Sequence, residues 1–139
     1  MSADALLAGQ HLLLSFYKAL DEARFSDAAT AFATNGEWHR KGEVLRGPDQ
    51  VARAFDGRDP DLRTRHVVSN ILLNPSEGGQ EFSLYITLFA TNASSDAVPT
   101  ISGPAMVLTS NGTLINQAGH WKIRTKQTTR QFRIKPANN

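Results

Sequence analysis

Residues 81–91 alternate between apolar and polar side chains with the two-residue period of a β-strand. The apolar positions of this segment are Phe82, Leu84, Ile86 and Leu88. This pattern predicts a strand with one face in the core and one face in solvent. Similar segments predict further strands over residues 66–73, 100–110 and 120–132, and Asn111-Gly112 predicts a hairpin turn before a short continuation over residues 113–116. We therefore expect the second half of the chain to form an antiparallel sheet.

The first half of the chain has helical patterns. Apolar residues recur at helical spacing from Asp4 to about Glu22, and Ser26 can cap a short second helix that ends near Asn35-Gly36. Residues 37–40 and 43–45 predict two short strands, and Gly47-Pro48-Asp49 opens a third helix. Three helices followed by long strands indicate one α+β domain over residues 1–139, whose curved sheet would wrap around the helices and enclose a cavity.

Composition excludes several classes of function. The chain has no cysteine, so it can form no disulfide, thiol nucleophile or zinc–thiolate site. Its four histidines are scattered and it has no phosphate-binding glycine loop, so we expect neither a metal nor another cofactor. It has no apolar run long enough to cross a membrane, and its N-terminus lacks the positive region of a signal peptide. We therefore expect a cytoplasmic protein with no membrane partner.

The end of the chain is basic, with no aspartate or glutamate after Asp96. Lys122, Arg124 and Lys126 alternate with Trp121, Ile123 and Thr125. This alternation favours a solvated strand face over a phosphate-binding patch, and we expect no nucleic-acid partner.

Several short segments together resemble the SnoaL-like branch of the nuclear transport factor 2-like (NTF2-like) superfamily. They are residues 17–21, 25–27, 45–48, 64–70 and 119–123, which occur in the order and spacing of that family. The resemblance implies a cone-shaped α+β barrel with an internal pocket, which usually forms a homodimer through the open face of its sheet. Members include polyketide cyclases, scytalone dehydratase-like lyases, steroid isomerases and the β subunits of ring-hydroxylating dioxygenases, so the fold alone does not define the function.

The resemblance assigns two catalytic candidates. Asp21 matches the helix-end aspartate of the scytalone dehydratase-like lyases, and His66 matches their histidine at the start of a strand. In those relatives the pair forms a dyad that removes a proton from carbon. Two departures argue against the same substrate: Leu20 replaces a tyrosine, and residues 101–105 lack the second histidine.

Other residues are candidates for the wall of the pocket. Strand alternation places Asn70 on the same face as His66, where its amide could contact a ligand or bond neighbouring backbone. Trp38 and His39 face opposite sides of one strand, so only one of them can line the pocket. The resemblance favours Trp38, because it matches an aromatic residue that is often found there in the family. The remaining candidates, for each of which ordinary core packing is the default interpretation, are Tyr17, Tyr85, Met106, Phe16 and Phe89.

Two hypotheses for the function follow. The chain is either a cofactor-independent lyase, isomerase or cyclase that acts on a small lipophilic cyclic molecule with the dyad, or a binding protein without chemistry. The second class includes ligand carriers and β-type accessory subunits of oxygenases. The dyad requires that Asp21 and His66, which are far apart in the sequence, meet in an apolar site.

Overall fold

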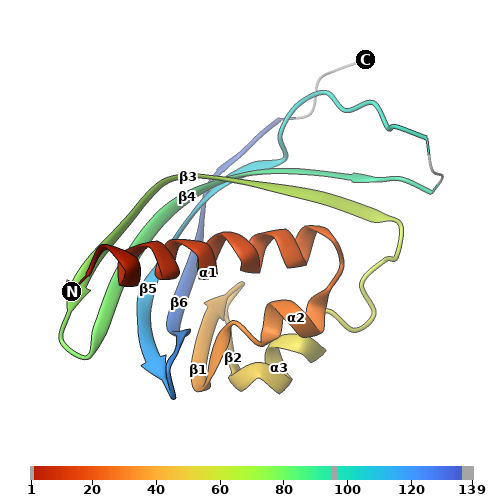
Figure 1. Cartoon of the computed structure of the whole chain (residues 1–139). Helices are drawn as coiled ribbons and strands as arrows, with labels where there is room; N and C mark the ends of the chain where they lie inside the picture. The colour runs from red at the N-terminus through yellow and green to blue at the C-terminus, as the bar shows by residue number, and fades with distance from the viewer. Residues whose placement is uncertain (1, 95–96, 136–139) are drawn as a thin grey trace.

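The computed structural model describes residues 2–94 and 97–135, which form three helices and six strands (Figure 1). Along the chain the elements are α1 (Ala3–Asp21), α2 (Phe25–Ala29), β1 (Phe32–Arg40), β2 (Glu43–Arg46), α3 (Gly47–Arg53), β3 (Leu62–Ser76), β4 (Gly79–Asn92), β5 (Met106–Gln117) and β6 (His120–Arg133). Among these residues, no helix is both long and apolar enough to cross a membrane.

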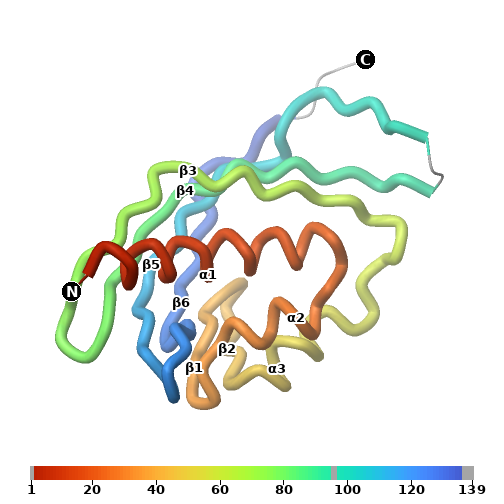
Figure 2. Tube along the Cα trace, viewed as in Figure 1, coloured from red at the N-terminus to blue at the C-terminus, as the bar shows by residue number. Residues whose placement is uncertain are grey.

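The six strands form one curved sheet in the order β2-β1-β6-β5-β4-β3. Helix α1 lies across the concave face, and α2 and α3 lie beside β1 and β2 (Figures 1 and 2). The predicted α+β architecture of three helices packed on a curved sheet is confirmed. The sheet is mixed rather than wholly antiparallel, because β1 and β6 run parallel, and it is not closed, because β2 and β3 remain as edge strands.

Helix α1 is held by caps at both ends and by an apolar face. The Ser2 hydroxyl accepts the Ala5 N–H at 3.2 Å, and Leu13, Phe16 and Leu20 are buried against the sheet. At the other end Ala23 adopts a left-handed φ of 57°, and its N–H donates to the Leu20 carbonyl at 3.1 Å. This termination places Asp21 in the last turn of the helix, where it faces β3.

Two predicted turns lie inside regular elements instead. The second helix ends at Ala29 and β1 begins at Phe32, so the predicted helix end at Asn35-Gly36 is wrong. The hairpin predicted at Asn111-Gly112 is also wrong, because β5 runs through it. Gly112 has a different purpose: a Cβ atom there would lie 1.9 Å from the Thr125 carbonyl oxygen, so only glycine lets β5 and β6 approach this closely.

A β-bulge in β3 reverses the alternation that was predicted from His66. The register shifts between Ser69 and Leu72, and Asn70 adopts a left-handed φ of 51°. The extra residue turns Leu72 to the outer face, where it is 63% exposed, while Leu73 packs against the core. The prediction that Asn70 shares the inner face of His66 is therefore wrong, because strict alternation does not continue through a bulge.

A second bulge, in β6, has the same effect on the basic segment. Thr125 pairs with Thr113, but Ile123 pairs with Leu114, so Arg124 is an extra residue. Lys126 therefore faces the core together with Ile123, and its side chain is fully buried. The predicted solvated face of Lys122, Arg124 and Lys126 is wrong for Lys126.

Candidate active site

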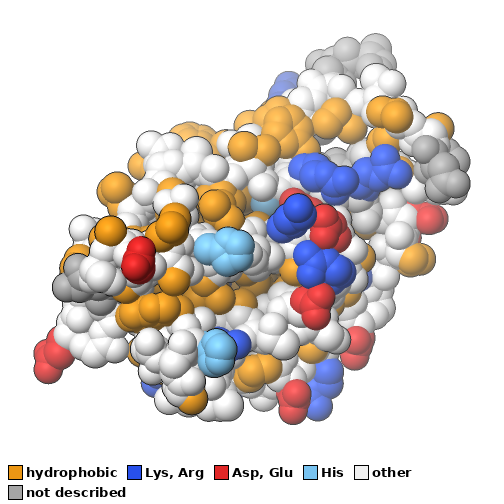
Figure 3. Space-filling view, in the orientation of Figure 1, with side chains coloured by type: hydrophobic (Ala, Val, Ile, Leu, Met, Phe, Trp, Pro, Cys, Tyr) orange, Lys and Arg blue, Asp and Glu red, His pale blue; other side chains and the backbone are white. Residues whose placement is uncertain are grey.

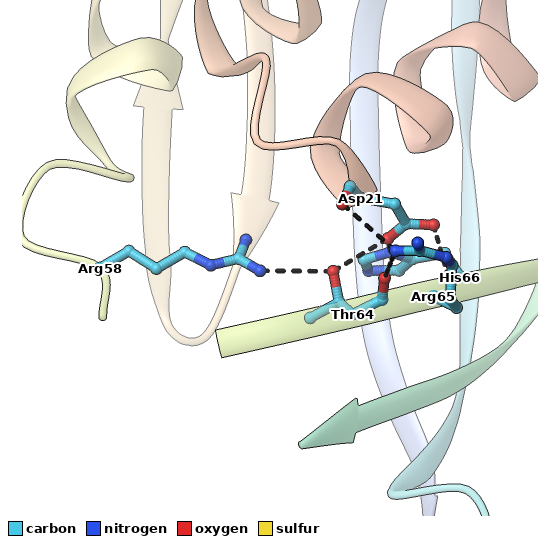
Figure 4. Close-up of polar contacts among 5 residues, drawn as sticks. All are labelled: Asp21, Arg58, Thr64, Arg65 and His66. Atoms are coloured by element: carbon cyan, nitrogen blue, oxygen red, sulfur yellow. Dashed lines mark hydrogen bonds and ion pairs between the residues drawn. The ribbon is translucent and has the colours of Figure 1, made fainter. Parts of the chain in front are cut away.

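The two catalytic candidates meet where the end of α1 packs against β3 (Figure 4). The His66 Nδ1 atom lies 2.6 Å from the Asp21 Oδ1 atom. The His66 backbone N–H also donates to Asp21 Oδ2 at 2.8 Å, so one carboxylate holds both the ring and the backbone of His66. Both side chains are largely shielded from solvent, with 10% of Asp21 and 16% of His66 exposed.

Neighbouring residues fix the orientation of the carboxylate. The buried Thr64 hydroxyl donates to Asp21 Oδ1 at 2.9 Å, and an Arg58 N–H group reaches the same hydroxyl at 3.3 Å. The Arg65 guanidinium donates to the Thr64 carbonyl at 2.7 Å (Figure 4). With both oxygens occupied, the carboxylate cannot rotate without breaking hydrogen bonds.

The electrostatics of the pair favour an ionised carboxylate. Burial alone would raise the pKa of Asp21, but the hydrogen bonds and charge of His66, together with the hydrogen bond from Thr64, lower that pKa below its ordinary value. An ionised Asp21 accepts a hydrogen bond from the Nδ1–H group, and in that tautomer of the neutral imidazole the lone pair lies on Nε2. No other residue in the described ranges 2–94 and 97–135 bonds Nε2.

The dyad lines a groove between α1 and β3, which we call the dyad groove. Its volume is about 320 Å³, and it is lined by Leu14, Tyr17, Lys18, Asp21, Glu22, Arg65, His66 and Val68. The Tyr17 ring packs against the His66 ring with centroids 5.2 Å apart. Figure 3 shows this side of the molecule, where several acidic and basic side chains gather over the C-terminal end of α1.

The interior beneath Tyr17 contains a polar cluster that sequence reasoning missed. The Lys126 ammonium nitrogen bonds the Tyr17 and Ser110 hydroxyls, and it lies 4.7–5.9 Å from the centroids of four aromatic rings. These rings belong to Phe16, Tyr17, Trp38 and Phe82. Burial, and secondly the charge of Arg40, hold the pKa of Lys126 well below its ordinary value. The enclosed pocket implied by the resemblance is not confirmed, since these side chains pack in the middle of the core.

The other predicted wall residues divide between the two faces of the sheet. Phe16 and Trp38 are buried, and the Trp38 indole N–H donates to the Thr128 hydroxyl at 3.0 Å. Met106 pairs with Leu88, which pairs with His66, so Met106 shares the inner face two strands away.

Three of the predicted wall residues do not lie near the dyad on the inner face. Asn70 is exposed at the bulge, Tyr85 is 50% exposed, and Phe89 has the opposite parity to Leu88, which is the cross-strand partner of His66. The sequence could have placed Tyr85 and Phe89 outside, because both have the parity of the polar positions in β4.

The described residues form no group of three or more histidine and carboxylate side chains that could hold a metal ion. The side chains of the dyad themselves offer a base at His66 and an oriented carboxylate at Asp21.

A comparison with protein-family models identifies the family of the chain. Residues 3–127 match the model of the SnoaL-like domain, which covers most of the sequence. The chain belongs to the SnoaL-like family. The search of curated proteins found no match to it.

Solved structures share this SnoaL-like fold at low sequence identity. Aln2 from a Streptomyces species is 21% identical with a TM-score of 0.75, over 94% of this chain and 93% of that one. ActVI-ORFA from Streptomyces coelicolor is 17% identical with a TM-score of 0.75, over 90% and 96%. A protein from Novosphingobium aromaticivorans, named as a candidate scytalone dehydratase, is 18% identical with a TM-score of 0.69, over 96% and 91%. At these identities the comparisons establish the fold alone.

Proposed function

We propose that this SnoaL-like protein removes a proton from carbon in a small lipophilic cyclic molecule, using His66 as the base. The observation that carries the proposal is the 2.6 Å contact between Asp21 and His66 in the dyad groove. Asp21 orients the ring and stabilises the imidazolium that forms when Nε2 takes the proton. The name of the Novosphingobium neighbour supports an elimination, although at 18% identity it adds no residue-level evidence.

The chemical step needs no group beyond the side chains of the groove. The C–H bond breaks, its proton moves to Nε2, and its electron pair forms a new C=C bond. In an elimination the leaving group departs with the electrons of its bond to carbon, and the proton on Nε2 passes to that group or to solvent. In an isomerisation the negative charge collects on a carbonyl oxygen until Nε2 returns its proton to a different carbon. The cations Lys18 and Arg65 line the same groove and would favour that negative charge.

The size of the groove limits the substrate. Ligand pockets commonly measure about 300–1,000 Å³, and the dyad groove at about 320 Å³ lies at the lower end of this range. Leu14, Val68 and the Tyr17 ring supply apolar contacts, so a molecule of one or two rings fits this groove best.

Hydrogen–deuterium exchange tests the proposal even while the product is unidentified. Cyclic ketones are incubated with the protein in D2O, and incorporation of deuterium at the acidic carbon is measured by mass spectrometry. We expect His66→Ala and Asp21→Asn to slow the exchange by a factor of about 100 or more. His39→Ala is a matched control, because His39 pairs with Glu37 at 3.1 Å outside the groove. Exchange that survives unchanged in His66→Ala refutes the proposal.

Binding without chemistry is the second candidate. It is supported by the packed interior and by the open groove, since a proton-transfer site usually excludes water more completely. A binding protein would retain a ligand through dialysis but would not accelerate deuterium exchange in it. In that case His66→Ala would change the affinity for the ligand, and the exchange would stay at its uncatalysed rate in both proteins.

We also propose that two copies associate through the outer face of the sheet. Its exposed apolar side chains are Val67, Leu72, Tyr85 and Phe132, which come from three strands. Burial of such a patch favours self-association. Light scattering should give the mass of a dimer for the native chain and of a monomer for Tyr85→Glu. A native monomer at all concentrations would exclude the dimer.

A further inference from the structure

Two arginine and three aromatic side chains pack in a series on the far side of Thr64 from the dyad groove. The Arg58 guanidinium carbon lies 5.2 Å from the Phe25 ring centroid, and the Phe25 and Phe55 rings stack at 4.7 Å with their planes 8° apart. The Arg40 guanidinium carbon lies 5.5 Å from the Phe55 centroid and 4.6 Å from that of Trp38. We call these five residues the arginine–aromatic ladder.

Among the described residues, carboxylates act on the arginines of the ladder only without direct ion pairing: the charge of Glu43 acts on Arg40, and that of Asp21 acts on Arg58. In the part of the chain that the structure describes, none of the ion pairs involves Arg40, Arg58 or their neighbours Lys41 and Arg130. Arg130 pairs with Leu108 on the inner face of the sheet, close enough for its charge to act on Arg40. Burial lowers the pKa of Arg40, Glu43 offsets part of this effect, and the charges of Arg130 and Arg58 lower the pKa further.

The way in which the two guanidinium groups are held leaves their hydrogen-bond donors available. Each guanidinium carbon lies 4.6–5.5 Å from the ring centroids that it contacts, and a guanidinium carries five N–H donors around the edge of its plane. One N–H group of Arg58 donates to the Thr64 hydroxyl at 3.3 Å. Within residues 2–94 and 97–135, the Arg40 side chain donates no hydrogen bond. A half-buried guanidinium with free donors is the usual partner of a carboxylate, which it binds through two parallel hydrogen bonds.

We propose that the arginine–aromatic ladder is a second binding site, which takes the carboxylate of a small aromatic acid. The carboxylate bonds the free edge of the Arg40 guanidinium group, and the aromatic ring of the ligand packs against the exposed side of the ladder. The bound anion offsets the repulsion among the four neighbouring cations. The proposal does not require that the dyad be catalytic, because the ladder lies outside the lining of the dyad groove.

Trp38 provides a direct optical readout of this site. The chain has two tryptophans, so Trp121→Phe leaves Trp38, beneath Arg40, as the only one. This variant is titrated with benzoate, with the neutral analogue benzyl alcohol and with inorganic phosphate, at ionic strength held constant with sodium chloride. We expect a saturable change of Trp38 emission with benzoate alone.

Variants separate the ladder from general charge effects. Arg40→Met keeps packing on the rings but removes the fork, and it should weaken benzoate binding at least tenfold. Arg58→Met removes a neighbouring positive charge rather than a contact with the carboxylate, so it should weaken the binding by a smaller but measurable factor. Arg46→Met is the matched control. Arg46 lies on neighbouring β2 and forms an ion pair with Glu37, so this variant should leave benzoate binding unchanged. Melting curves in the absence of ligand confirm that each variant is folded, and if Arg40→Met fails to fold, the Arg58→Met result decides.

Three outcomes overturn the proposal. The first is an emission change that stays linear with benzoate or is equal for benzyl alcohol. The second is equal affinity for phosphate, which would show a site for any oxyanion rather than an aromatic carboxylate. The third is benzoate binding that is the same in the folded variants as in the parent. Because the readout is fluorescence, a negative result here is independent of the deuterium exchange that tests the dyad.

Discussion

The Tyr17 ring contacts two polar clusters, the dyad and the cluster around Lys126, and their surroundings have opposite effects on a charged side chain. In the dyad groove, the Asp21 carboxylate is stabilised by hydrogen bonds from His66, and both side chains remain partly exposed. In the core, Lys126 is fully buried among aromatic rings, and its hydrogen bonds go to the neutral hydroxyls of Tyr17 and Ser110. The first arrangement stabilises a charged state that chemistry can use, whereas the second penalises the charged amine.

The comparison predicts that Lys126 costs stability at neutral pH. Replacing Lys126 with Met keeps much of the volume and the ring contacts but removes the desolvated amine. We expect Lys126→Met to raise the free energy of unfolding by about 1–4 kcal/mol, by analogy with buried charges replaced by apolar residues. Urea unfolding monitored by circular dichroism measures this change.

Lys122→Met is the control for that variant, because Lys122 lies on the same strand and donates to the Thr30 carbonyl near the surface. Its stability should fall slightly or stay unchanged. A Lys126→Met protein that is less stable than the parent at neutral pH would show that the ammonium is stabilised in the core.

The loss of one support of the dyad should have a smaller effect. Thr64→Val removes the hydroxyl that donates to Asp21 and accepts from Arg58, at nearly constant volume. We expect a loss of about 1 kcal/mol in the free energy of unfolding, as for one buried hydrogen bond. Thr64→Ser should retain most of the stability, and equal losses in both variants would mean that packing rather than the hydroxyl matters.

The two clusters should give pH dependence in separate ranges. Because the pKa of Lys126 is lowered, the unfolded chain binds more protons than the folded one below pH 10.5, so stability falls as the pH drops from that value. Because the pKa of Asp21 is lowered, its contribution is lost only as the pH falls below about 4.

Unfolding curves as a function of pH distinguish these contributions. Lys126→Met should flatten the alkaline part of the curve and leave the acidic part, and Asp21→Asn should do the reverse. If Asp21→Asn leaves the acidic part as steep as in the parent, the carboxylate does not gain stability from His66.

Much of the architecture could be predicted from the sequence, because it depends on periodic patterns. The helical spacing before Glu22 and the alternation from Phe82 to Leu88 correspond to α1 and β4. The resemblance brought Asp21 and His66 together as candidates, and the structure places them in contact. Whether that contact is catalytic remains a prediction, which the exchange experiment tests.

The errors came from single residues that interrupt a pattern. One extra residue in β3 turned Asn70 outward, and another in β6 turned Lys126 inward. A bulge depends on the partner strand, so the sequence of one strand cannot reveal it. Gly112 marks a place where β5 and β6 approach each other closely. Because it follows Asn111, the sequence predicts a hairpin turn there instead.

The central claim is that Asp21 fixes the His66 ring so that Nε2 is the free base. The nitrogen-15 chemical shifts of the neutral His66 ring measure this directly, because they report which nitrogen carries the hydrogen. We predict hydrogen on Nδ1 and a lone pair on Nε2 in the parent protein, and a mixture of both forms in Asp21→Asn. Hydrogen on Nε2 in the parent, or the same shifts in both proteins, would contradict the account.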